Sequence, residues 1–280
     1  MEKTTRKDFL RGIGGVALGA MAMGLASCTV EEAKAVETPE IPWPYRQLDP
    51  VAAAERAYAA YYKGGCMYGA YESIIGMLRE TVGGPYLGIP TAMMKYGAAG
   101  VAGWGTLCGA LNGAAAAIYL IAQSNPLISE VFGWYGVEAL PNYKPQNPKF
   151  EEIIATVPGT QLCHVSVTRW CNESGFKANS PERAERCGWL TASVVKFTVE
   201  LLNQQAAASS TAAGSAKFDP QADIVLNPND PFTPTYVNSE EVKLCLSCHG
   251  QEGMVGNVHA TKQTECTLCH FSLAPEHPFP

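Results

Sequence analysis

Two short motifs near the end of the chain hold the residues whose types and spacing are best suited to chemistry. Their sequences are Cys-Leu-Ser-Cys-His at 245–249 and Cys-Thr-Leu-Cys-His at 266–270. In each motif, two thiols three residues apart can form thioethers to the two vinyl groups of a porphyrin, and the next histidine can bind its iron. The motifs predict two haem c groups, attached through Cys245, Cys248, Cys266 and Cys269, with His249 and His270 as proximal axial ligands.

The same four cysteines also have the spacing of a zinc ribbon. A ribbon, however, makes no use of a histidine directly after each cysteine pair. Haem attachment is therefore favoured, and a lipid-tethered zinc-binding module is the less favoured alternative.

Three further histidines are available for the distal positions of the two irons. His259 lies between the motifs and His277 shortly after the second, whereas His164 lies far upstream. We expect His259 and His277 to be the distal ligands, with His164 as their main rival. Filled positions leave no place for substrate and predict an electron carrier. A five-coordinate haem would instead predict a reductase of a small oxidised substrate.

Residues 1–28 are typical of a bacterial export signal, with a basic start and an apolar core rich in Gly and Ala. Leu-Ala-Ser-Cys at 25–28 resembles a lipobox, so Cys28 is predicted to carry a lipid, with a plain secretory signal or an uncleaved anchor as the alternatives. The opening Thr-Thr-Arg-Lys-Asp-Phe-Leu resembles a twin-arginine signal in which Lys7 replaces the second arginine. We expect an exported lipoprotein, tethered to the membrane on its periplasmic side.

The remainder of the chain divides into four segments by composition. A linker rich in Glu and Pro at 29–50 precedes a helical, cysteine-bearing redox domain at 51–205. A second linker at 206–235 leads to the dihaem c-binding segment at 236–280. The predicted fold is mainly α, a helical domain with small-residue helix contacts followed by a loop-rich C-terminal dihaem segment.

Local signals support the helical assignment. Asp49-Pro50 and Ser180-Pro181-Glu182 each combine a capping side chain with proline at the first helical position. Gly109, Ala110, Gly113 and Ala114 form a small-residue face. The charged fraction is 16% and the formal net charge is −6, which does not suit nucleic acid as a partner.

Of the ten cysteines, those at 66, 108, 163, 171 and 187 remain once the haem motifs and Cys28 are assigned. An odd number cannot all pair within one chain, which argues against a disulfide framework. Each can be a small buried residue. Cys108 begins a predicted helix, where the free N–H groups favour a thiolate.

The segment Thr-Leu-Cys-Gly-Ala-Leu-Asn-Gly-Ala at 106–114 resembles the redox-active proteins named for their C, GCAxxG, C, C pattern. Cys66 matches the first cysteine, Cys108 the second, and Cys163 and Cys187 the last two. The resemblance covers about residues 66–202 and leaves Cys171 outside the pattern. Leu107 stands where the pattern has glycine, and Gly113 comes one residue late.

Joined to the two haem motifs, this arrangement is similar to the split-Soret cytochromes c of anaerobic bacteria. The resemblance implies a mostly helical homodimer with two closely spaced haems per chain. It also implies bis-histidine irons, with axial ligands contributed across the dimer, and a non-haem iron site. Cys66, Cys108, Cys163 and Cys187 are then candidate ligands of an iron–sulfur centre.

The expected function is electron transfer with redox protein partners, in an anaerobic respiratory chain. For the four cysteines, a dithiol redox site and plain core packing are the alternatives to an iron–sulfur centre.

Overall fold

The structure is a computed structural model that describes residues 39–208. The export signal with Cys28 lies outside the described residues, as do both haem motifs and the candidate ligands His259 and His277.

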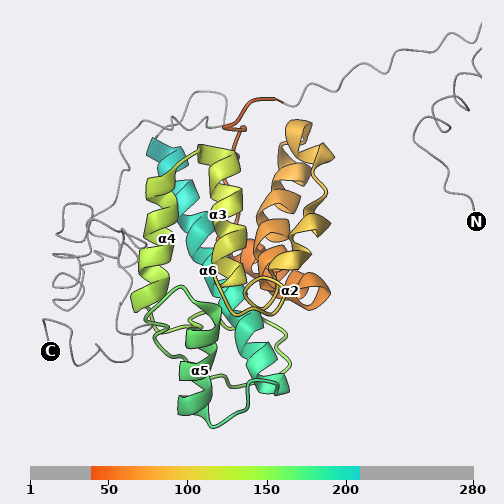
Figure 1. Ribbon diagram of the computed structural model, residues 1–280. Coiled ribbons are helices and arrows are strands. Elements are labelled where there is room, and N and C mark those ends of the chain that lie inside the picture. The colour runs from red at the N-terminus through yellow and green to blue at the C-terminus, as the bar shows by residue number, and fades with distance from the viewer. Residues whose placement is uncertain (1–38, 209–280) are drawn as a thin grey trace, which may run out of the picture. The chain divides into compact units, whose positions relative to one another are not determined.

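The described part is built from helices, as predicted for a mainly α protein (Figure 1). They are α2 (Pro50–Thr81), the 3-10 helices η2 (Gly84–Gly88) and η3 (Thr91–Gly97), α3 (Gly109–Ala122), α4 (Asn125–Val137), α5 (Cys163–Ser174) and α6 (Pro181–Ala208). Two isolated antiparallel bridges, Leu107 with Leu162 and Leu140 with Thr156, lie within residues 39–208. None of these helices combines the length and apolarity needed to cross a membrane.

The predicted helix starts are confirmed by their caps. The Asp49 carboxylate accepts hydrogen bonds from the backbone N–H groups of Val51 and Ala52, at 2.8 and 3.2 Å. The Ser180 hydroxyl accepts from the N–H of Arg183 at 3.2 Å. Each cap satisfies donors that have no partner inside the helix, which fixes where α2 and α6 begin.

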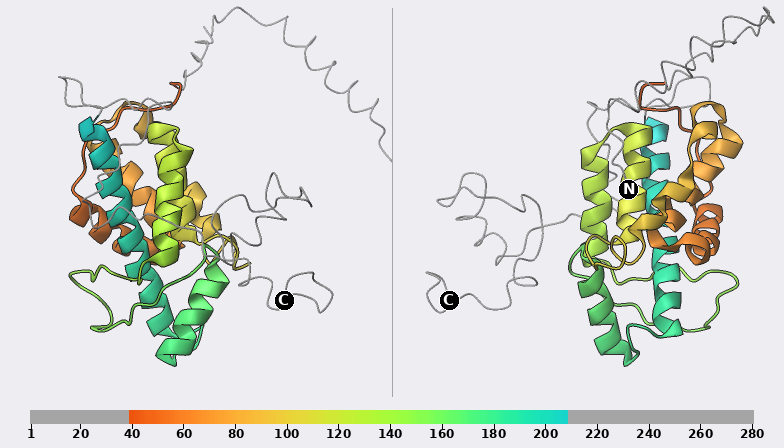
Figure 2. Two further views of the ribbon diagram at one scale, coloured as in Figure 1. Left: turned by 90° about the vertical axis from the view of Figure 1, so that its left-hand side faces the viewer. Right: turned by 45° about the vertical axis from the view of Figure 1, so that its right-hand side comes forward.

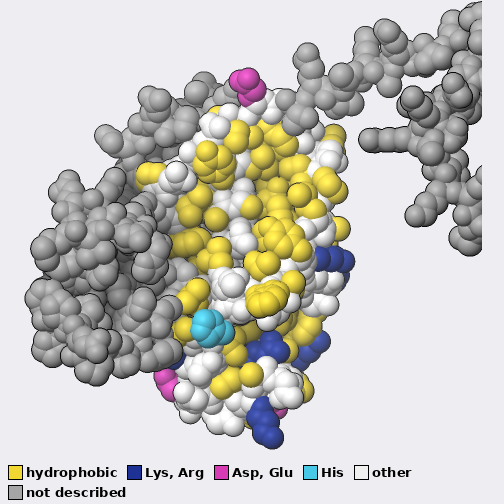
Figure 3. All heavy atoms as spheres, in the orientation of Figure 1, with side chains coloured by type: hydrophobic (Ala, Val, Ile, Leu, Met, Phe, Trp, Pro, Cys, Tyr) yellow, Lys and Arg dark blue, Asp and Glu magenta, His cyan; other side chains and the backbone are white. Residues whose placement is uncertain are grey.

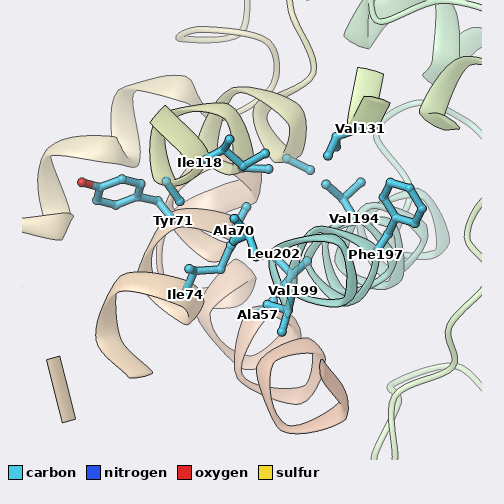
Figure 4. Close-up of a cluster of buried hydrophobic side chains, with 14 of the residues drawn as sticks. Ala57, Ala70, Tyr71, Ile74, Ile118, Val131, Val194, Phe197, Val199 and Leu202 are labelled. Carbon is cyan, nitrogen blue, oxygen red and sulfur yellow. The ribbon is translucent and has the colours of Figure 1, made fainter. Parts of the chain in front are cut away.

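Helix α6 lies against α2, α3 and α4 and supplies much of the core. Figure 4 shows Val194, Val199 and Leu202 of α6 among side chains from the three other helices. All three are buried, and burying a side chain of this size contributes about 1.5–3 kcal/mol. Helix α5 lies beside the N-terminal part of α6 (Figure 2). The segment that begins at Cys163 is helical through Ser174.

Part of the predicted first linker belongs to the core. Trp43 is 4% exposed, and Tyr45 and Leu48 are also buried. The Tyr45 hydroxyl donates to the Asn203 side chain at 2.8 Å, and the Asn203 amide donates to the Leu48 carbonyl at 2.8 Å. The boundary expected at residue 50 is therefore wrong. This proline-rich segment has no helical period, but its aromatic side chains anchor it to α6 and to neighbouring helices.

The small-residue face of α3 allows close contact with α2. A β-carbon at Gly113 would lie 2.4 Å from the backbone oxygen of Met67, and one at Gly109 would lie 2.9 Å from the Met67 nitrogen. Neither group can rotate away, because both belong to the α2 backbone. Glycine at these two positions therefore sets the distance between the two helices.

We predict that Gly113→Ala destabilises the protein by about 1–3 kcal/mol, because the added methyl group overpacks the α2–α3 contact. The loss should outweigh the gain of roughly 1 kcal/mol in helix propensity. Urea unfolding of the full chain, followed by circular dichroism, measures the change. Gly88→Ala is the matched control, since no heavy atom lies near its added β-carbon. Equal unfolding midpoints for Gly113→Ala and the wild type would contradict the close approach.

Candidate functional site

Four helical elements bring together the four cysteines predicted as ligands. Cys66 lies in α2, Cys108 caps α3, Cys163 begins α5, and Cys187 lies in α6. Cys66, Cys108 and Cys187 are buried, and Cys163 is partly buried. The charge of each thiol influences the pKa of the others, for all pairs among the four. We call these four residues the cysteine cluster.

A short antiparallel bridge holds two members of the cluster side by side. Leu107 pairs with Leu162. The N–H of Cys108 donates to the Gln161 carbonyl at 2.9 Å, and the N–H of Cys163 donates to the Thr106 carbonyl at 2.6 Å. Residues far apart in the sequence are thereby fixed at the point where α3 and α5 both begin.

The kink in α2 and the small residues of α3 position Cys66. Gly65, with φ of 82°, interrupts the helical backbone directly before Cys66. A β-carbon at Gly109 would lie 3.0 Å from the β-carbon of Cys66, so the neighbour of Cys108 must be very small. This contact places the Cys66 side chain next to the N-terminus of α3.

A glycine- and alanine-rich segment lies against the other side of the cluster. Ala99, Val101 and Ala102 have positive φ values of 52°, 64° and 51°. Left-handed backbone costs roughly 1–2 kcal/mol for a residue other than glycine. Between them, Gly100 has no room for a side chain, since a β-carbon would lie 2.8 Å from the β-carbon of Cys163. A strained turn therefore packs directly on the cluster.

The side chains of Cys66 and Cys187 are hydrogen-bonded to each other. The hydrogen bond from Cys66 lowers the pKa of Cys187, as do the guanidinium groups of Arg186 and Arg183, and together they outweigh the effect of burial. The same hydrogen bond and burial raise the pKa of Cys66. These contacts thus favour the thiolate form of Cys187 and the thiol form of Cys66.

Burial dominates the pKa of the other two members. It raises the pKa of Cys108, against hydrogen bonds from the Tyr135 side chain and from the N–H groups of Leu111 and Ala110. Burial also raises the pKa of Cys163 to about 12, with a further increase from the neighbouring thiols. Without a cation among them, these two cysteines remain thiols.

Arg186 links Cys187 to Cys108 through a series of hydrogen bonds. Its guanidinium is buried, donates to the sulfur of Cys187, and donates from Nη2 to the Ser166 hydroxyl at 2.8 Å. The Ser166 and Tyr135 oxygens are 3.1 Å apart, and Tyr135 is hydrogen-bonded to Cys108. The guanidinium can only donate, so the Ser166 oxygen accepts from it. The hydrogen-bonded series of Arg186, Ser166, Tyr135 and Cys108 therefore joins α6, α5, α4 and the start of α3.

Sequence reasoning did not identify the polar residues of this site. Arg183 is half-buried and is hydrogen-bonded to Cys187, like Arg186. The signal was present in the spacing, because residues 183, 186 and 187 share one face of a helix. Nothing comparable in the sequence distinguishes Ser166 or Tyr135 from other residues of their helices.

Four cysteine sulfurs are the donors that usually hold iron–sulfur clusters in proteins. Within residues 39–208, no three Cys, His, Asp or Glu side chains already form a coordination set. The four thiols are neighbours, not a preformed site. Two nearby arginines supply positive charge that would offset the additional thiolates needed for binding.

Two other predicted residues lie close to the cluster. Cys171, on α5, is partly buried, and burial raises its pKa. His164 is exposed, and its ring Nδ1 lies 2.9 Å from the Gly105 carbonyl. Because a carbonyl only accepts, this contact requires a proton on Nδ1 and leaves the Nε2 lone pair available to a metal. His164 is therefore chemically suited to be a distal axial ligand of a haem iron.

Comparison with known proteins agrees with this arrangement. The family model described as "Putative redox-active protein (C_GCAxxG_C_C)" matches residues 68–201, a range that includes Cys108, Cys163 and Cys187. The curated protein "Split-Soret cytochrome c" of Desulfovibrio desulfuricans (strain ATCC 27774 / DSM 6949 / MB) is 34% identical over 287 residues, which cover 96% of this chain and 95% of that protein.

A solved structure is also similar. It is described as "A novel iron centre in the split-Soret cytochrome c from Desulfovibrio desulfuricans ATCC 27774". The match has a TM-score of 0.66 and 34% identity, and it covers 83% of this chain and 91% of that chain. With this degree of identity over nearly its full length, the chain belongs to the split-Soret cytochrome c family.

Proposed function

We propose that this protein is a dihaem c-type cytochrome that transfers electrons and also holds an iron–sulfur centre in its cysteine cluster. The observation that carries the proposal is the meeting of Cys66, Cys108, Cys163 and Cys187, from four separate elements, beside two arginines. A relative described as having an iron centre supports the same assignment.

The four cysteines would hold the centre, which supplies a one-electron change of oxidation state when bound. The chain's own residues determine its surroundings. Burial of Cys66, Cys108 and Cys187 keeps water away, and Arg183 and Arg186 stabilise negative sulfur. The short pairing at Leu107 and Leu162 fixes the spacing of two ligands. These features suit electron transfer, which needs little rearrangement between oxidation states.

The hydrogen-bonded Cys66–Cys187 pair supports a second candidate, a dithiol redox site. Forming a disulfide bond between the Cys187 thiolate and the Cys66 thiol releases two electrons and one proton. Two ferric haems would take up the two electrons and become ferrous, and solvent would take up the proton. This alternative needs no metal in the cluster, so metal analysis distinguishes it from the iron–sulfur proposal.

We predict that the haem-loaded full chain, purified without oxygen, contains more iron than its two haems account for. Serine at position 66, 108, 163 or 187 should reduce the non-haem iron at least about tenfold, because a hydroxyl replaces a ligand. Cys171→Ser is the matched control for Cys163→Ser, since both lie on α5, and it should retain the iron. If the wild type contains only as much iron as haem per chain, and mass spectrometry finds a Cys66–Cys187 disulfide, the dithiol redox site is favoured.

We predict that both haems are low-spin and do not bind carbon monoxide. Alanine in place of a true distal ligand should open one iron and produce a carbon monoxide complex, recorded by its absorption spectrum. We expect this result for His259→Ala and His277→Ala, with His164→Ala as the comparison that tests the rival ligand. A pyridine haemochrome assay counts the haems. High-spin, ligand-binding haem in the wild type would support the reductase instead, and no haem would support the zinc module.

Export through the signal at 1–28 and lipid attachment at Cys28 are part of the same proposal, as are redox partners in an anaerobic respiratory chain. We also propose that the chain forms a homodimer. Figure 3 shows apolar side chains gathered over one face of the described part. Exposed apolar residues of the α2–α3 connection and of α3 include Leu87, Met93, Tyr96, Trp104 and Tyr119, with Trp104 82% exposed. A second copy that buries such side chains would gain association free energy.

We predict that Trp104→Ser weakens the dimer at least about tenfold, because aromatic anchors often dominate the free energy of an interface. Sedimentation velocity of the haem-loaded chain over a range of concentrations measures the effect. Phe176→Ser, another exposed aromatic residue, is the control and should leave dimerisation unchanged. A monomeric wild type in which Trp104 is protected from labelling would mean that the chain covers this face with its own residues.

A further inference from the structure

Arg186 is a buried charge without the usual partner. Its side chain is 1% exposed, yet within the described part of the chain the ion pairs of Arg and Lys with Asp or Glu do not include it. Moving a cation out of water costs several kcal/mol unless an anion and hydrogen-bond acceptors replace the water. The residues around Arg186 must therefore supply negative charge by other means.

Among residues 39–208, the sulfur of Cys187 is the group that acts most strongly on the charge of this guanidinium. Arg186 donates to Cys187, and the charges of Cys187, Tyr135 and Cys108 all act on it. Ser166 accepts from Nη2 at 2.8 Å but is neutral. One thiolate thus faces a cation that can donate five hydrogen bonds.

The Nε–H of Arg186 is buried and has no hydrogen-bond acceptor among residues 39–208. An unsatisfied buried donor of a charged group costs about 1–3 kcal/mol or more. The hydrogen bond from Nη2 to Ser166 holds the rigid guanidinium in place, so the Nε–H group is fixed and lacks an acceptor.

We propose that Arg186 is the positioning residue of the iron–sulfur centre. It offsets the negative charge of the centre, and its Nε–H donates to an inorganic sulfide. This inference rests on the proposed function. A water molecule in place of the sulfide would satisfy Nε–H but would add no negative charge beside the two guanidinium groups, Arg183 and Arg186, that share the Cys187 sulfur. Four thiolates with sulfide and iron carry net negative charge, so the centre provides the acceptor and the counter-charge together.

This role has a consequence for the reduction potential. Reduction of the centre adds one negative charge, which a neighbouring guanidinium stabilises. Removing the guanidinium should therefore shift the reduction equilibrium toward the oxidised form. The shift is a readout that loss of packing alone does not produce.

The test uses the anaerobically purified, haem-loaded full chain and its variants Arg186→Gln, Arg186→Lys and Arg169→Gln. Arg169 is the matched control, since it lies on α5 and donates to the Val157 carbonyl, not to the cluster. Non-haem iron, acid-labile sulfide and the potential of the non-haem centre are measured for each, the last by a redox titration followed by electron paramagnetic resonance.

We expect Arg186→Gln to lower the reduction equilibrium constant at least about tenfold, which is about 59 mV for one electron. Arg186→Lys keeps the charge but loses the Nε–H donor, so its potential should stay near that of the wild type while its sulfide content falls. Arg169→Gln should match the wild type in all three measurements. If Arg186→Gln does not fold, the lysine variant decides the question through its sulfide content and potential.

Wild-type potential and sulfide in Arg186→Gln would overturn this inference and leave the iron–sulfur centre in place. Wild-type sulfide in Arg186→Lys would overturn the role of Nε–H. A wild-type chain with no non-haem iron would overturn the proposed centre itself, and the inference with it.

Discussion

The contact between the Arg186 guanidinium and the Cys187 sulfur is the interaction on which the arrangement of the cluster depends. A buried cation and a buried thiolate are each costly alone, and each lowers the cost of the other. The hydrogen bond from Arg186 to Ser166 joins α6 to α5, and the hydrogen bond between Tyr135 and Ser166 joins α5 to α4. Arg186 therefore contributes both to the charge balance at the sulfurs and to the packing of the helices.

Close packing of small residues brings Cys66 to the start of α3. Gly109 and Gly113 let α3 approach the α2 backbone, and the kink at Gly65 turns Cys66 toward the start of α3. A larger residue at Gly109 would collide with Cys66 itself. The glycine face that brings two helices together thus also brings two ligands together, which explains why the redox residues lie at this contact.

Local features of the fold were predictable from sequence, whereas those that depend on distant contacts were not. Asp49 and Ser180 cap helices because the capping side chain and the backbone N–H groups that donate to it are sequence neighbours. Trp43 lies in a segment without periodicity, and only its packing in the tertiary structure shows that it is core. The grouping of the four cysteines came from a family resemblance, since their wide spacing carries little information. Arg186 was missed because arginine is usually exposed.

The two kinds of redox site depend on the fold in opposite ways. Each haem motif is a contiguous run of five residues, so covalent attachment requires little beyond the local sequence. The cysteine cluster needs α2, α3, α5 and α6 in place, and the pairing of Leu107 with Leu162 and its adjoining hydrogen bonds join the starts of α3 and α5. The proposed metal binding there would consequently be linked to folding. The proposed export signal at 1–28, which resembles those of proteins transported in the folded state, would suit a centre that only the folded domain can hold.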